Sequence, residues 1–119
     1  MKPGEQEYID ATLTIIRQTL SDEPERMVSQ IKEAEARVGY CYFILSQLNA
    51  ELDRAESVAA DNFSRAEKLS AYVLEDKVNA AVSENRAQRD IVQGLIKSLE
   101  GRTMVGLGIL RYLRSLPGA

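Results

Sequence analysis

PERMVSQIKEAEARVGYCYFILSQLNAELDRAESVAADN, residues 24–62, is the stretch of sequence that decides the fold. Apolar residues recur in it at every seventh position, and a second apolar set follows three positions behind the first. The first set is Ile31, Val38, Leu45, Leu52 and Ala59, and the second is Ala34, Cys41, Leu48 and Ala55. A heptad repeat of this length predicts one helix over residues 24–62 that takes part in a coiled coil.

A helix of that length needs a partner along most of its surface. At 1.5 Å per residue it is about 58 Å long, which is more than the width of a compact protein of 119 residues. The partner is a second helix of the same chain in a long hairpin, a helix of another subunit, or both. The connecting segment near residues 61–70 is long enough for either arrangement.

The remaining sequence predicts further helices and no strands. We expect helices at residues 5–20, 71–100 and 103–115, with a polar interval at 83–90 that is either solvated helix or a short break. A second break is expected at Gly101. The predicted fold is therefore all-α: a single domain over residues 1–119, with a long antiparallel helical hairpin or coiled coil, short N- and C-terminal helices, and an oligomeric state.

An apolar belt in the long helix predicts a contact between subunits. Residues 40–45 are apolar on nearly every side of the helix, which is typical of a helix with more than one neighbour. One wide bundle core is the alternative. The predicted oligomer interface combines this belt with the terminal helix, through Tyr40, Tyr42, Phe43, Met104, Leu107, Leu110 and Leu113.

The residues needed for catalysis are sparse. The chain has no histidine and one cysteine, Cys41, which lies on the heptad stripe and is expected to be a packed core residue. The carboxylates fall on solvated helix faces. Gly101-x-x-x-x-Gly106-x-Gly108 lacks the Lys-Ser/Thr of a phosphate-binding loop and is better explained by a kink or by close helix approach. We expect a protein that is not an enzyme and that holds no cofactor and no metal.

The charge is divided unevenly along the chain. Residues 1–85 hold 16 of the 18 acidic residues, whereas residues 86–119 hold 6 of the 15 basic residues and only 2 acidic ones. A basic, apolar last third favours binding to an anionic partner or to other copies of the chain. The candidate nucleic-acid contacts from this segment are Arg86, Arg89, Lys97, Arg102, Arg111 and Arg114, and Tyr112 could stack on a base. Alternatively, these cations balance the acidic stem of another subunit.

The order of these features resembles the bacteriophage UvsY-like recombination mediator family. The likeness covers roughly residues 27–116. The long heptad helix holds an aromatic stretch at residues 40–43, and a second helix starts with an acidic-basic-Val pattern at residues 74–78. That second helix ends at residues 96–99, and the last helix starts with a basic and then an apolar residue at residues 102–104. The resemblance implies an oligomer, a hexamer or heptamer, that binds single-stranded DNA and helps to load a recombinase onto DNA coated with a single-strand-binding protein.

The family also has basic residues near the bend after the long helix. Only Arg65 and Lys68 match them here, so the resemblance adds these two to the candidate DNA contacts. A helical scaffold or assembly protein that uses only protein contacts is the main alternative. A second alternative is an oligomeric sponge or inhibitor that binds a small anionic ligand or a host protein. With no hydrophobic signal core near residue 1, we expect the cytoplasm, of the host cell if the chain is phage-encoded, and no membrane partner.

Overall fold

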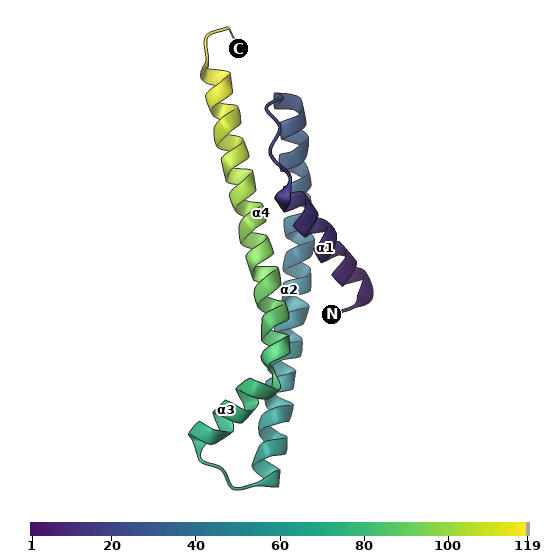
Figure 1. Cartoon of the computed structure of the whole chain (residues 1–119), viewed down its shortest axis with the longest axis vertical. Coiled ribbons are helices and arrows are strands. Elements are labelled where there is room, and N and C mark those ends of the chain that lie inside the picture. Colours follow the sequence, from purple (N-terminus) through teal and green to yellow (C-terminus); the bar gives the residue numbers. More distant parts are fainter. Residues whose placement is uncertain (119) are drawn as a thin grey trace.

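The computed structural model describes residues 1–118 and confirms the all-helical fold class. Within these residues there are four helices and no strand: α1 (Pro3–Arg17), α2 (Pro24–Ala66), α3 (Ala71–Ala81) and α4 (Ser83–Ser115). Helices α2 and α4 run antiparallel and share the most extensive contact in the molecule (Figure 1). Helix α3 folds back against the end of α2, and α1 lies across the other half of the hairpin (Figure 1).

The molecule is a rod. Its principal extents are 75 × 28 × 18 Å and its radius of gyration is 20.4 Å, against about 13.5 Å for a compact chain of this length. The hairpin is closed at the α3 end and open at the other, where α2 begins and α4 ends (Figure 1). A shape this thin leaves much of each helix without a partner inside the chain.

The heptad stripe of α2 forms the core, as the sequence predicts. Its residues Ile31, Ala34, Cys41, Leu48 and Leu52 are buried. From α4, the main cluster receives the buried side chains of Val92, Leu95, Ile96 and Leu99. One detail differs from the strict seven-residue repeat, because Ile44 is fully buried while Leu45 is only half-buried. The repeat resumes at Leu48 and Leu52, which are buried, so the difference is local.

In the second half of the chain, the helices do not break where the sequence predicts. The predicted break at Gly101 is wrong, because α4 runs unbroken from Ser83 to Ser115. Glycine costs about 1 kcal/mol in a helix interior, and the packing of Leu99 and Leu110 on either side of it offsets this cost. The chain instead bends at Val82, just before the polar interval, where φ is −106° and ψ is 13°. Val82 is buried at this bend, which turns α3 onto α2.

The glycines of α4 fall into two groups with opposite surroundings. A Cβ at Gly106 would lie 2.8 Å from two side-chain atoms of Ile31, so this glycine allows α2 and α4 to approach closely. A Cβ at Gly94, Gly101 or Gly108 would have nothing within 4 Å. These three exposed glycines each cost the helix about 1 kcal/mol relative to alanine, and no contact within the chain explains them.

Helix α1 is shifted towards the N-terminus relative to the prediction. It spans Pro3–Arg17 and not residues 5–20. Pro3 is accommodated in the first turn, where no backbone donor is needed. Ile9 and Thr12 are fully buried against the hairpin, and Arg37 of α2 donates a hydrogen bond to the Thr12 hydroxyl at 2.9 Å. Among residues 1–118, none of the helices has the length and apolar character needed to cross a membrane.

Candidate functional site

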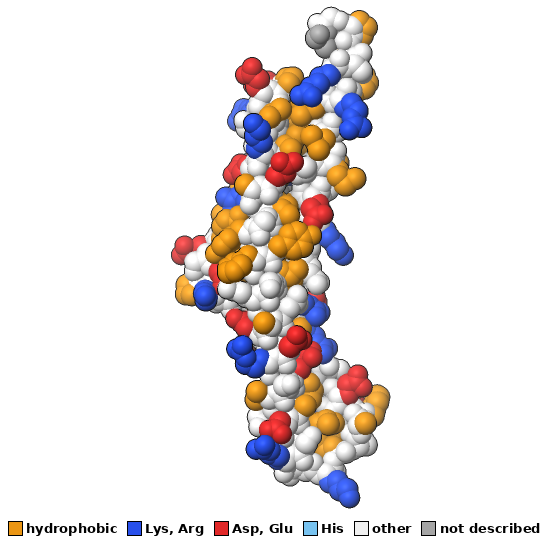
Figure 2. Space-filling model, turned by 180° about the vertical axis from the view of Figure 1, so that it is seen from behind, with side chains coloured by type: hydrophobic (Ala, Val, Ile, Leu, Met, Phe, Trp, Pro, Cys, Tyr) orange, Lys and Arg blue, Asp and Glu red, His pale blue; other side chains and the backbone are white. Residues whose placement is uncertain are grey.

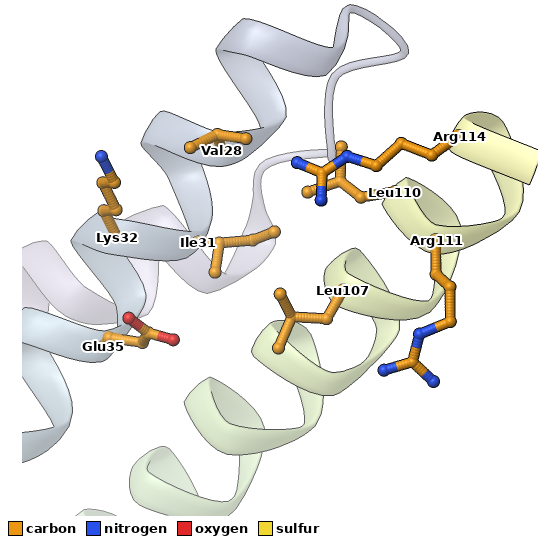
Figure 3. Close-up of a pocket in the computed structure, with 8 residues that line it drawn as sticks. All are labelled: Val28, Ile31, Lys32, Glu35, Leu107, Leu110, Arg111 and Arg114. Atoms are coloured by element: carbon orange, nitrogen blue, oxygen red, sulfur yellow. The ribbon is translucent and has the colours of Figure 1, made fainter. Parts of the chain in front are cut away.

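An apolar groove lies at the open end of the hairpin. Val28 and Ile31 of α2 and Leu107 and Leu110 of α4 line it, and its volume is about 390 Å³ (Figure 3). The groove lies beyond the close approach of the two helices at Gly106, towards the start of α2 and the end of α4. Leu110 packs on Met27 and Ile31 in a small separate core beneath the groove.

Basic side chains surround this apolar floor. Lys32 comes from α2, and Arg111 and Arg114 come from one face of α4, three residues apart. Arg114 reaches over Leu110 towards α2, and Arg111 lies at the outer edge of α4 (Figure 3). The only acidic residue of the lining is Glu35, and none of the three cations has an ion-pair partner among residues 1–118. The groove therefore offers a net positive charge beside an apolar surface.

Three of the predicted DNA contacts are instead paired with carboxylates of the same chain. Arg86 of α4 pairs with Glu56 of α2 at 3.0 Å, which ties the two helices together near the closed end. The other two pairs are local, Arg89 with Asp90 at 3.0 Å and Arg65 with Asp61 at 3.2 Å. In each pair the carboxylate offsets the charge of the guanidinium, which weakens its attraction for a phosphate.

Lys68 and Lys97 have no ion pair among the described residues and are exposed. Lys68 lies in the connection between α2 and α3 at the closed end, and Lys97 lies in the middle of α4 beside Tyr42 and Glu100. The structure therefore does not gather the eight predicted contacts into one surface. It brings Arg111 and Arg114 together and spreads the other six along the rod.

Arg102 anchors α1 to the hairpin. Its Nη1 donates hydrogen bonds to the backbone carbonyl oxygens of Ile16 and Gln18, at the C-terminal end of α1. These carbonyls have no partner inside α1, because the last carbonyls of a helix are always left free, and a cation there also opposes the negative end of the helix dipole. The Nε and Nη2 atoms of Arg102 are buried without a partner in residues 1–118. The side chain is committed to the fold and does not line the groove.

We expect Arg102→Gln to loosen α1 without unfolding the hairpin. The substitution removes a charged donor from two carbonyls, at a cost of about 1–3 kcal/mol. Amide hydrogen exchange of α1 should become faster, while that of Leu95 and Leu99 in the core stays slow. Lys97→Gln, an exposed change on the same helix, is the control and should leave α1 unchanged. Uniformly faster exchange in all four helices of the Arg102 variant would contradict an anchoring role.

The predicted aromatic belt is largely exposed. Tyr40, Tyr42 and Phe43 are 41%, 50% and 54% accessible. Tyr40 stacks edge-on against Tyr8 of α1, with ring centroids 4.5 Å apart, and Tyr42 donates a hydrogen bond to Glu100 of α4 at 2.7 Å. This bond raises the pKa of the Tyr42 hydroxyl, because ionising the phenol would place two negative charges side by side. Figure 2 shows hydrophobic side chains gathered over the middle of the rod and again near its upper end.

The terminal-helix part of the predicted interface divides into exposed and buried residues. Met104 is 74% exposed and Leu107 is 46% exposed, whereas Leu110 is buried within the chain and Leu113 is half-buried. Leu110 is therefore a core residue of the hairpin in this arrangement and is not available to another subunit. Its burial follows from the antiparallel pairing, which brings the start of α2 beside residue 110.

Cys41 is buried in the main core and is a free thiol. Burial raises the pKa of this thiol, because a thiolate there would lose its hydration. In the part of the chain that the structure describes, no three His, Cys, Asp or Glu side chains lie close enough together to hold a metal ion.

Cys41 should therefore react with a thiol reagent only when the hairpin opens. At pH 8 we expect labelling of the native protein to be at least about 100-fold slower than labelling in denaturant. Above the ordinary thiol pKa of about 8.5, the unfolded chain ionises while the folded chain stays protonated, so this group lowers stability as pH rises. Labelling at pH 8 and pH 9.5, followed by mass spectrometry, measures both effects. Rapid labelling of the native protein would show an accessible, reactive thiol.

Lys32 is the residue of this site that the sequence does not predict. It belongs to the acidic first part of the chain, and only the antiparallel pairing brings it to Arg111 and Arg114. The signal that points to it is its place next to Ile31 of the heptad stripe, once the partner helix and its register are known. Comparison of the chain with protein-family models, with curated proteins and with solved structures found no significant match.

Proposed function

We propose that the protein is a non-enzymatic homo-oligomer that binds single-stranded DNA and acts as a recombination mediator, helping to load a recombinase. The observation that carries this proposal is the open-end groove, where Lys32, Arg111 and Arg114 are free of ion pairs beside an apolar floor. The resemblance to the UvsY-like family supports the recombination role. A recombinase and a single-strand-binding protein are the proposed protein partners.

The groove suits single strands better than duplex DNA. Phosphates need cations at tolerant positions, which three flexible basic side chains supply. The bases of a single strand are unstacked and can lie on apolar surface, which Val28, Ile31 and Leu107 supply in the groove. In duplex DNA the same base faces are hidden in the stack, so only the phosphate contacts remain.

One groove is small for a DNA-binding protein, which is why the proposal includes assembly. A volume of about 390 Å³ accommodates a nucleotide or two, whereas single-strand-binding folds typically cover about 4–16 nucleotides. Several copies on one strand raise the overall affinity through effective concentration. The exposed belt at Tyr42 and Phe43 is apolar surface that further copies could cover.

The test is binding of fluorescence-labelled oligo-dT across a salt titration, with light scattering on the same samples. We expect a defined oligomer whose affinity falls steeply with salt and which prefers oligo-dT to a duplex of equal length. An oligomer that ignores oligo-dT at 50 mM salt would overturn the DNA-binding proposal.

A structural or assembly protein that acts only through protein contacts is the second candidate. Four of the eight predicted DNA contacts, Arg65, Arg86, Arg89 and Arg102, are engaged within the chain, which favours this role. It shares the prediction of an oligomer and differs only in the DNA result. The same titration therefore separates the two candidates.

A further inference from the structure

The outer face of α4, opposite its contact with α2, carries a second heptad pattern. Ile91, Ser98, Val105 and Tyr112 recur at every seventh position, and Gly94, Gly101 and Gly108 follow each of the first three by three residues. We call these seven residues the outer seam. All seven are exposed in the single chain.

We propose that the outer seam pairs with the same seam of a second copy of this chain, with the two α4 helices antiparallel. A heptad seam with both of its positions in solvent is a helix face that lacks its partner. The glycines are the unexplained part, because they weaken α4 and touch nothing within the chain. In an antiparallel pair they become the sites at which the two helix backbones approach closely.

The shape of the seam matches itself in an antiparallel pair. If Ser98 faces Gly101 of the second copy, each other layer of the pair is fixed by the seven-residue spacing. Ile91 then faces Gly108, Val105 faces Gly94, and Tyr112 faces Ala87. These three layers each set a large side chain against a small residue, which is the condition for dense interdigitation. The central layer, Ser98 against Gly101, sets two small residues together, so the two backbones can approach closely there. The contact runs from residue 87 to residue 112, about 38 Å of helix.

A parallel pair would lose this match. Each glycine would then face the same glycine and each large residue its own copy, so gaps would alternate with crowded layers. The symmetry of the match about its centre also points to a second copy as the partner, because a two-fold axis makes one surface complementary to itself.

Charge favours the same arrangement. Asp90 immediately precedes Ile91, and Arg111 immediately precedes Tyr112, at the flanking position of the heptad. In the antiparallel pair, Asp90 of each copy, which also pairs with Arg89 of its own chain, lies within one helical turn of Arg111 of the other. In a parallel pair, Asp90 would face Asp90 and Arg111 would face Arg111. The contact uses Arg111 and leaves Lys32 and Arg114 for the groove.

The first test is Gly101→Leu, measured by sedimentation at several concentrations. The new side chain meets nothing within its own chain but fills the centre of the seam, so we expect the mass to fall at least twofold from that of the wild type. Helicity and cooperative thermal unfolding should be retained, because leucine favours helix. Gly4→Leu, at an exposed glycine of α1 with equally open surroundings, is the matched control and should keep the wild-type mass.

The second test is the direction of pairing, in a Cys41→Ala background. An equimolar mixture of Ala87→Cys and Tyr112→Cys proteins should form a disulfide-linked heterodimer on oxidation, while Tyr112→Cys alone should form none. Cross-linking of Tyr112→Cys alone, or an unchanged mass for Gly101→Leu, would overturn the proposal.

This inference rests on the homo-oligomeric part of the proposed function and not on DNA binding. A wild-type monomer that binds oligo-dT would overturn the seam and leave the DNA proposal standing. An oligomer that fails to bind oligo-dT but dissociates in the Gly101→Leu variant would support the seam and overturn the DNA proposal.

Discussion

The double variant Lys32→Glu/Arg114→Glu is expected to bind oligo-dT about 100-fold more weakly than the wild type at 50 mM salt. The two cations lie on opposite walls of the open-end groove and have no ion pair to lose within residues 1–118. Reversing them places two acidic residues beside Glu35 on the rim of the groove. The slope of log affinity against log salt should fall by about 2, one for each phosphate contact removed.

A matched control has the same change in net charge at a distance from the groove. Lys2→Glu/Arg54→Glu alters two exposed basic residues, one just before α1 and one on α2, and neither is a candidate DNA contact. We expect it to change affinity by less than about tenfold, through the general field of the protein. Equal losses in the two variants would mean that overall charge, and not the groove, governs DNA binding. Light scattering on both variants checks that assembly is unchanged.

Leu99→Ala is expected to lower the free energy of unfolding by about 2–5 kcal/mol. Leu99 is completely buried between α2 and α4, and the rod is too thin for neighbouring side chains to close a cavity from several directions. In a chain of this size, 3 kcal/mol corresponds to a fall in Tm of roughly 15 °C.

Leu107→Ala is the control for this change, since it removes the same atoms from the same helix at a residue that is 46% exposed. It should cost less than about 1 kcal/mol. Thermal and urea unfolding followed by circular dichroism measure both variants. Similar losses for the two leucines would mean that the hairpin contact is not where the stability of the chain resides.

The sequence predicts the main helix pair well because the packing there is periodic. Residues such as Ala34, Cys41 and Leu48 lie on one stripe of α2, and a stripe of that length requires a partner helix. The pattern does not show how much each contact stabilises the helix pair. Gly101 looks like a helix end when taken alone, yet the contacts of Leu99 and Leu110 on either side outweigh its cost.

The candidate site is harder to predict because its members come together only in the folded chain. Lys32 and Arg114 are far apart in sequence and join only through the antiparallel register. Arg102 is a basic residue in the basic last third of the chain, so the sequence predicts a DNA contact, but its guanidinium donates hydrogen bonds to the free carbonyls at the end of α1. The spacing of Gly94, Gly101 and Gly108 is visible in the sequence, but their lack of neighbours is visible only in the structure.

The single closed end of the hairpin sets an order in which its contacts can form. The Arg86–Glu56 ion pair near that end closes a segment of 30 residues, and the Tyr42–Glu100 bond closes 58. The approach of Ile31 to Gly106 closes 75 residues, and the added loop entropy relative to 30 residues is about 0.8 kcal/mol. The helices should therefore zip from α3 outwards and fray first at the groove. A ligand bound between Lys32 and Arg114 would hold α2 and α4 together where they separate most easily. It would therefore slow amide hydrogen exchange in the half of the hairpin nearest its open end.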